Sequence, residues 1–141
     1  MENNLILQVG VKILLKNKDN QYLLIRRSLV KYPEVASGRW DIVGGRINPG
    51  STLINNLKRE ILEETALELV GAPKLLAAQD ILRKPGHHVV RLTYIGEAKG
   101  EIKLDESEND IYKWYSWEEL ISLDDVDTYF KELLNDSSIW K

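Results

Sequence analysis

The stretch GGRINPGSTLINNLKREILEETALEL, residues 44–69, joins a glycine-rich loop to a segment with the pattern of a helix. The helical part, residues 52–67, contains neither glycine nor proline, and its Ile54, Leu57 and Ile61 recur at the spacing of one helical face. The three glycines and one proline in front of it are typical of a tight, irregular connection. The stretch therefore predicts a loop that leads directly into an amphipathic helix.

Three glutamates of this helix lie within five positions of one another. Glu60, Glu63 and Glu64 are related as i, i+3 and i+4, so their side chains fall within an arc of roughly 100°. Like charges at this spacing repel each other, whereas a divalent cation prefers several hard carboxylate oxygens and would turn the repulsion into affinity. Arg59 leaves the helix at a different angle and reaches only part of the cluster. The alternative, a solvated acidic face, is favoured for the acidic run taken by itself.

The composition of the chain excludes several classes of function. With 141 residues and 43% hydrophobic content, we expect residues 1–141 to form a single domain with a real core. The net charge of −3 offers no basic surface for an extended nucleic acid. The absence of cysteine excludes disulfides, thiolate metal sites and a cysteine nucleophile. There is no signal-peptide pattern and no run of 18 apolar residues, so we expect a cytoplasmic protein without a membrane partner.

The hydrophobic pattern predicts strands on both sides of the glutamate helix. They are expected at residues 7–15, 22–27, 40–43, 70–83, 87–98 and 111–117. The first two are joined by turn residues and form a hairpin. A capping-box pattern at Ser116 and Glu119, followed by apolar residues at helical spacing from Val126 to Leu134, predicts helices near the C-terminus. We therefore expect an α/β fold in which a mixed sheet lies between helices.

The quoted stretch resembles the signature of the Nudix hydrolases, G-x5-E-x7-R-E-U-x-E-E-x-G-U, in which U is a bulky aliphatic residue. Laid from Gly45 to Leu67, the signature matches at seven of its nine defined positions, including the whole R-E-x-x-E-E core. Ser51 replaces the first glutamate and Ala66 replaces the second glycine. Ser51 has two readings: a helix N-cap, or the loss of a carboxylate near the metal site.

The resemblance extends over roughly residues 5–135, because Trp40 precedes the glycines and an acidic run precedes Trp114. It implies the Nudix fold, an α/β/α sandwich around a mixed sheet. It also implies Mg²⁺-dependent hydrolysis, with Mn²⁺ as a second candidate metal, of a pyrophosphate linkage in a nucleoside diphosphate derivative. The chain length resembles that of nucleoside triphosphate pyrophosphohydrolases. Nucleotide sugars, ADP-ribose, dinucleoside polyphosphates, capped RNA ends and a non-catalytic nucleotide-binding module stay open, as do a monomer and a homodimer.

The resemblance also implies which residues act. The metal ligands map onto four acids, Glu60, Glu63, Glu64 and Glu108. Glu60 or a neighbour is the expected base for the attacking water, and Glu63 and Arg59 complete the catalytic set, with Arg59 orienting the carboxylates. Glu108 comes from the position six residues before Trp114, with Glu106 as second choice. The alternative for both is a solvated acidic loop.

Substrate contacts are expected from Arg26, Arg27, Trp40, Gly44 and Gly45. Because side chains alternate along a strand, only one of the two arginines can face the cleft. The two glycines permit the backbone to approach phosphate oxygens or fix the start of the helix. Trp40, Tyr94 and Trp114 either stack on a base or pack in the core, and the core is the commoner place for such residues. His87 and His88 are expected at the surface.

Overall fold

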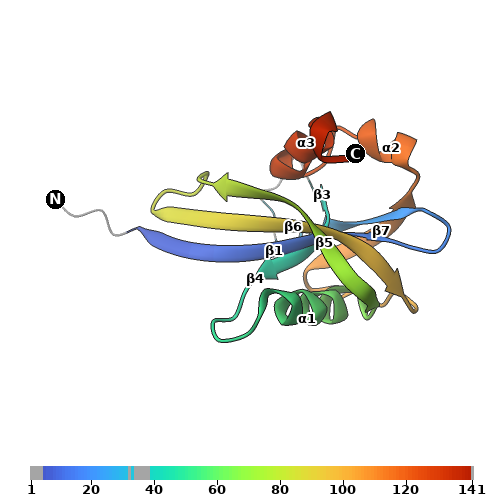
Figure 1. Cartoon of the computed structure of the whole chain (residues 1–141), viewed down its shortest axis with the longest axis horizontal. Coiled ribbons are helices and arrows are strands. Elements are labelled where there is room, and N and C mark those ends of the chain that lie inside the picture. Colours follow the sequence, from blue (N-terminus) through green and yellow to red (C-terminus); the bar gives the residue numbers. More distant parts are fainter. Residues whose placement is uncertain (1–4, 32, 34–38, 141) are drawn as a thin grey trace.

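The computed structural model describes residues 5–31, 33 and 39–140, and within them the chain forms seven strands and three α-helices (Figure 1). In chain order these are β1 (Ile6–Lys16), β2 (Tyr22–Arg27), β3 (Trp40–Asp41), β4 (Val43–Arg46), α1 (Leu53–Thr65), β5 (Glu68–Ile81), β6 (His87–Lys99), β7 (Asn109–Tyr115), α2 (Trp117–Ile121) and α3 (Thr128–Leu134), before a 3-10 helix (Ser137–Trp140). The predicted strands are all present. The strand predicted at residues 40–43 is divided between β3 and β4 and ends three residues later, and the ends of the others differ by up to two residues.

The strands form one mixed sheet in the order β3-β2-β1-β6-β5, with β4 paired to β1 and β7 paired to β2. β1 and β6 run parallel, from Ile6 opposite His87 to Lys16 opposite Glu97. The other strand pairs are antiparallel. Helix α1 covers one face of the sheet, and α2 and α3 cover the other (Figure 1). The predicted mixed sheet between helices is therefore confirmed.

Alternate residues of β1 enter two separate cores. Val11, Ile13 and Leu15 are buried under α1, whereas Leu14 is buried on the opposite face with Phe130 of α3. Burial of apolar surface on both faces stabilises the layers by roughly 25 cal/mol per Å². On the α3 face, Lys12, Gly10 and Gln8 precede Leu14 at two-residue intervals, so the apolar core on this face does not continue along these residues.

The glycine-rich stretch is more regular than its composition predicts. Val43–Arg46 forms β4, antiparallel to β1, with Gly44 opposite Lys12. Gly44 has φ +149°, and a Cβ added there would lie 2.1 Å from the carbonyl oxygen of Val11, so only glycine fits. The prediction of an irregular loop is wrong for residues 44–46, because pairing with β1 outweighs the weak strand preference of glycine.

Helix α1 begins and ends at residues with defined capping geometry. The hydroxyl of Thr52, and not that of Ser51, accepts a hydrogen bond from the N–H of Asn55 at 3.1 Å. The N-cap reading of Ser51 is therefore wrong. The helix ends at Ala66, which adopts the left-handed conformation with φ 63° and donates its N–H to the carbonyl of Leu62. At α2, the predicted capping box of Ser116 and Glu119 is confirmed.

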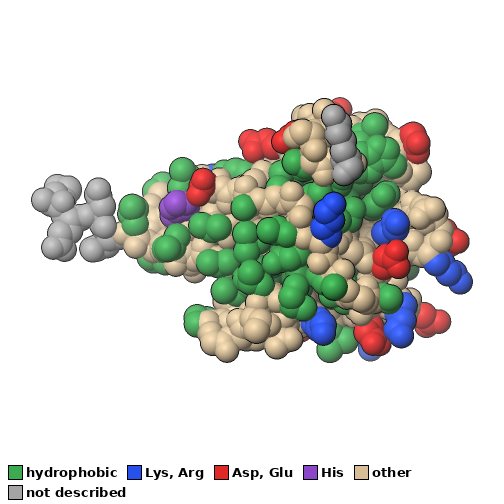
Figure 2. Space-filling model, in the orientation of Figure 1, with side chains coloured by type: hydrophobic (Ala, Val, Ile, Leu, Met, Phe, Trp, Pro, Cys, Tyr) green, Lys and Arg blue, Asp and Glu red, His purple; other side chains and the backbone are tan. Residues whose placement is uncertain are grey.

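The strand β5 lies at one edge of the sheet and presents apolar residues to solvent. Val70 and Leu75 of this strand are exposed, and hydrophobic side chains gather over this part of the molecule (Figure 2). An open apolar edge of this kind is prone to association with other chains. No helix among the described residues has the length and apolar character needed to cross a lipid bilayer.

Candidate active site

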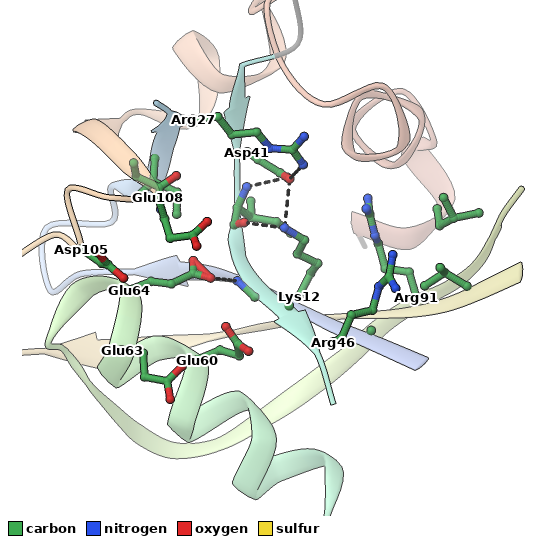
Figure 3. Close-up of a pocket in the computed structure, with 18 of the residues that line it drawn as sticks. Lys12, Arg27, Asp41, Arg46, Glu60, Glu63, Glu64, Arg91, Asp105 and Glu108 are labelled. Atoms are coloured by element: carbon green, nitrogen blue, oxygen red, sulfur yellow. Dashed lines mark hydrogen bonds and ion pairs between the residues drawn. The ribbon is translucent and has the colours of Figure 1, made fainter. Parts of the chain in front are cut away.

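A cleft of about 600 Å³ opens between α1, β4, β1 and β6. The charged residues on its two sides have opposite sign (Figure 3). We call Glu60, Glu63, Glu64, Asp105 and Glu108 the acidic half of the cleft, and Arg46, Arg83, Lys84 and Arg91 the cationic half. The four acids predicted as metal ligands therefore line one cleft together.

Helix α1 approaches this cleft closely because two glycines of β4 lie against it. The N–H of Gly44 donates to Oε1 of Glu64 at 3.3 Å. A Cβ added to Gly45 would lie 2.8 Å from Oε1 of Glu60, so any side chain there would displace the carboxylate. The predicted contact of these glycines with phosphate stays a prediction. The structure gives them a further role, which is to position the carboxylates of Glu60 and Glu64.

Arg59 joins the helix to the end of β4. Its guanidinium donates to Oε1 of Glu60 at 3.0 Å and to Oε2 of Glu63 at 3.3 Å. It also donates to the carbonyl of Arg46 at 3.2 Å. The geometry is that expected of a residue that orients carboxylates, because one rigid planar group fixes two of them at once.

A residue that the sequence analysis missed supports Arg59. Asn56 is buried, and its Oδ1 accepts hydrogen bonds from Arg59 at 3.0 Å and from the N–H of Asn48 at 2.8 Å. Its Nδ2 donates to the carbonyl of Thr52 at 2.8 Å. Asn56 thus fixes the loop before α1 and the guanidinium together. The available signal was an amide one helical turn before Glu60, on the side of the helix that faces the sheet.

Burial strongly perturbs the carboxyl group of Glu64. Its pKa is raised to about 8, first by burial and also by the nearby Glu60, against the lowering effects of Lys12 and the Gly44 N–H. As they stand, no three Asp, Glu or His side chains in the described part of the chain enclose a metal site, and Arg59 is bonded to Glu60 and Glu63. The hard carboxylate oxygens that converge here nevertheless suit a divalent cation.

The loop before β7 supplies the remaining acids of the acidic half. Asp105 lines it although the sequence analysis did not select this residue, whereas Glu106 is not among the lining residues. Hydrogen bonds from the hydroxyl and N–H of Ser107 lower the pKa of Asp105. The signal was the Asp-x-Ser spacing, which favours a local turn that fixes the carboxylate. The other acid, Glu108, forms an ion pair with Lys31.

The two predicted arginines of β2 separate as alternation requires. Arg27 lines the cleft and donates to Oδ2 of Asp41 at 3.2 Å, an oxygen that also accepts from Lys12 at 3.0 Å. Arg26 instead pairs with Asp110 at 2.8 Å and lies over the ring of Trp40, outside the lining of the cleft. Of the two, only Arg27 is placed to touch a substrate.

The predicted aromatic residues pack in the two cores. Trp40 meets Tyr115 edge to face, with ring centroids 5.8 Å apart, while Tyr94 and Trp114 belong to the core under α1. None of the three predicted stacking residues lines the cleft, so their core reading is the one that the structure supports. His87, expected at the surface, is half-buried in the cleft wall.

The cationic half was not found from the sequence, because its members come from β4, the connection between β5 and β6, and β6. Arg91 is buried and donates to Oδ2 of Asp127 at 2.9 Å, and Arg83 reaches Oδ1 of the same carboxylate at 3.5 Å. Both guanidinium groups lie over the ring of Tyr129, at 5.5 and 5.3 Å. Burial raises the pKa of Asp127, but the charges of Arg91 and Lys12 outweigh this and bring the pKa below its usual value.

Comparisons with known proteins agree with this architecture. A putative 8-oxo-dGTP diphosphatase of Bacillus subtilis (strain 168) is 28% identical over 108 residues, which cover 76% of this chain and only 65% of that protein. A MutT protein from Methanosarcina mazei Go1 superposes with a TM-score of 0.77 at 24% identity, covering 94% of each chain. A MutT NUDIX hydrolase from Burkholderia pseudomallei gives 0.76 at 23% identity, covering 94% of this chain and 98% of that one. The family model of the NUDIX domain matches residues 6–136, and the chain therefore belongs to the NUDIX domain family.

Proposed function

We propose that the protein hydrolyses a pyrophosphate linkage in a nucleoside diphosphate derivative, with Mg²⁺ or Mn²⁺ bound in the acidic half of the cleft. The observation that carries this proposal is the convergence of five carboxylates, from α1 and from the loop before β7, on one cleft. Such a concentration of negative charge would be unfavourable for binding a phosphorylated substrate unless a cation were bound with it.

The metal ligands would be Glu60, Glu63, Glu64 and Glu108. A divalent cation held by them would neutralise diphosphate oxygens and would lower the pKa of the attacking water. Their fit to such a cation rests on hard oxygen donors and on the raised pKa of Glu64, whose largest cause is burial.

The protein's own residues then have distinct roles. Arg59 holds the carboxylates of Glu60 and Glu63 in fixed orientations through its two hydrogen bonds. Glu60 accepts a proton from the attacking water, and Arg27, which faces the cleft, contacts a phosphate oxygen. Gly44 and Gly45 keep the backbone of β4 close enough for these carboxylates to line the cleft.

The first substrate class is the nucleoside triphosphates, which would be cleaved to a nucleoside monophosphate and pyrophosphate. The chain length and the name of the relative from Bacillus subtilis support this choice. The substrate would come from the cytoplasmic nucleotide pool.

The test is a panel of nucleoside triphosphates, nucleotide sugars, ADP-ribose and dinucleoside polyphosphates, each with Mg²⁺ or Mn²⁺ and without metal. Chromatography of the products identifies the bond that is cleaved. We expect hydrolysis of triphosphates that requires the metal and is abolished by Glu60→Gln.

The matched control is Glu106→Gln, which removes the same charge from a residue outside the lining of the cleft. It should hydrolyse the substrate at the wild-type rate. If no compound is hydrolysed with either metal and nucleotides bind tightly, the protein is a nucleotide-binding module and not an enzyme.

A further inference from the structure

The cationic half carries more positive charge than its carboxylate partner balances. Arg91 and Arg83 share the single carboxylate of Asp127. Arg46 is bonded to the neutral amide of Gln8, and no acidic partner of Lys84 is found among the described residues. Unbalanced cations in a cleft attract anions more strongly than the same cations would on an open surface.

Two of these arginines lie on the strands that flank Gly10 of β1. Arg46 of β4 lies opposite Gly10 of β1, and Gly10 lies opposite Arg91 of β6. Residues opposite one another in a sheet point to the same face, and two strand spacings separate the outer backbones by about 10 Å. Gly10 contributes no side chain between the arginines, and Figure 3 shows both on the side of the cleft away from Glu63 and Asp105.

A buried polar atom in the same wall lacks a partner. Nδ1 of His87 is buried and has no hydrogen-bond partner in the described structure. His87, Val89 and Arg91 are every second residue of β6, and all three line the cleft, so the histidine lies four residues before Arg91 on the same face of the strand. A buried polar atom without a partner is costly, so this wall of the cleft contains a polar group whose hydrogen-bonding capacity the protein does not use.

We propose that the cationic half is an anion subsite that binds one more phosphate group of the substrate, beyond the two phosphates of the scissile linkage. This inference rests on the proposed function, in which the acidic half holds that linkage. The two halves are adjacent, because Arg59 bonds the carbonyl of Arg46 as well as Glu60. The preferred substrates then carry a third phosphate, and derivatives that end in a neutral sugar bind less well.

Two groups could supply the third phosphate. One is the terminal phosphate of a triphosphate chain, and the other is a phosphate on the ribose. Steady-state kinetics with Mg²⁺ compare a nucleoside 5′-triphosphate, a nucleoside 5′-diphosphate with a 3′-phosphate, the plain diphosphate and ADP-ribose. We expect one of the first two compounds to have a KM at least about tenfold below that of the plain diphosphate and of ADP-ribose. Equal KM values for all four would overturn the proposal.

Arg83→Gln and Lys84→Gln test the residues without disturbing the core, because both side chains are exposed. Each should raise the KM of the compound with the third phosphate about tenfold, leave its kcat close to the wild-type value, and leave ADP-ribose kinetics unchanged. Lys74→Gln, on β5 and outside the lining of the cleft, is the matched control. If the double variant Arg83→Gln/Lys84→Gln keeps the wild-type preference, the subsite does not exist.

Calorimetry with inorganic tripolyphosphate and pyrophosphate, each with Mg²⁺, separates this inference from the proposed function. Tripolyphosphate should bind at least about tenfold more tightly, and the double variant should lose that difference. If no compound is hydrolysed but this result is obtained, the proposed function fails and the subsite stands. If hydrolysis occurs and tripolyphosphate binds no better than pyrophosphate, the subsite fails alone.

Discussion

The two halves of the cleft carry opposite charges and are built in different ways. Three of the five acids come from adjacent turns of one helix, α1. The four cations come from β4, β6 and the connection between β5 and β6, and two of them meet Asp127, the N-cap of α3. The acidic half is therefore a local arrangement on a helix that packs through its other face. The cationic half also connects the sheet to α3.

This difference predicts opposite effects on stability. Carboxylates that crowd together without a metal repel one another, so removing one should not harm the fold. A buried carboxylate that two arginines share cannot be removed without leaving unpaired charge behind. Substitutions in the acidic half should thus change the chemistry and spare the fold, whereas substitutions at the base of the cationic half should change the fold itself.

Asp127→Ala is expected to have the largest effect. It leaves Arg91 buried without its partner and removes the carboxylate that accepts from the N–H groups of Tyr129 and Phe130. The free energy of unfolding should fall by about 3 to 5 kcal/mol in urea denaturation. The control Asp110→Ala removes a half-exposed ion pair with Arg26 and should cost less than about 1 kcal/mol. Equal losses in the two variants would contradict the structural role of Asp127.

The loss of stability at acid pH tests the same structural role of Asp127. Arg91 and Lys12 hold the pKa of Asp127 below its usual value despite burial. A carboxyl with a lowered pKa contributes stability that is fully present above its unfolded pKa, near 4, and lost as the pH falls through its folded pKa. Urea denaturation across this range should show a steeper acid loss for the wild type than for Asp127→Ala. Parallel curves would show that Asp127 is not the group responsible.

Glu64→Gln should give the next largest effect, a fall in kcat/KM of more than about 100-fold. Without metal its thermal midpoint should rise, because Glu64, whose pKa is raised to about 8 mainly by burial, must take up a proton on folding at neutral pH, whereas a glutamine is neutral throughout. Glu63→Gln is the matched comparison: its side chain is 59% exposed, so activity should fall and the midpoint should stay constant. Near wild-type activity of either variant at saturating Mg²⁺ would remove it from the metal site.

Arg59→Lys should lower kcat about tenfold with little change in KM. A lysine keeps the charge but loses the planar fork that now reaches Glu60, Glu63 and the carbonyl of Arg46 together. Steady-state kinetics at saturating metal give the two parameters separately. A large rise in KM with an unchanged kcat would make Arg59 a substrate ligand instead of a positioning residue.

The sequence predicted what is local and missed what is assembled over distance. Helix 52–67 was predicted within two residues of its observed ends, because its apolar spacing and its acids lie on one segment. Residues 44–46 were wrongly predicted as loop, since their strand conformation depends on pairing with β1. Arg83 and Arg91 gave no signal, because only the folded sheet brings them to the same carboxylate.

Residue type alone left the aromatic positions undecided. Trp40 and Trp114 could stack on a base or pack in a core, which is the commoner place for such residues, and both pack. Alternation along β2 did predict that Arg26 and Arg27 diverge, but it could not say which one faces the cleft. That choice depends on Asp41, the partner of Arg27, and on Asp110, the partner of Arg26.

The smallest expected effect lies at the end of α1. Ala66 occupies the position where the family signature has glycine, and it adopts φ 63°, a conformation that costs a residue with a Cβ about 1 kcal/mol. Because its side chain is exposed, Ala66→Gly removes this strain and loses no packing, so the free energy of unfolding should rise by about 0.5 kcal/mol after the added flexibility of the unfolded chain is counted. The control Ala72→Gly, at an exposed position of β5 with ordinary backbone angles, should lower stability by a similar amount. Both variants should keep wild-type activity, since neither residue lines the cleft. A loss of stability in Ala66→Gly would show that the helix carrying the acidic half ends without strain.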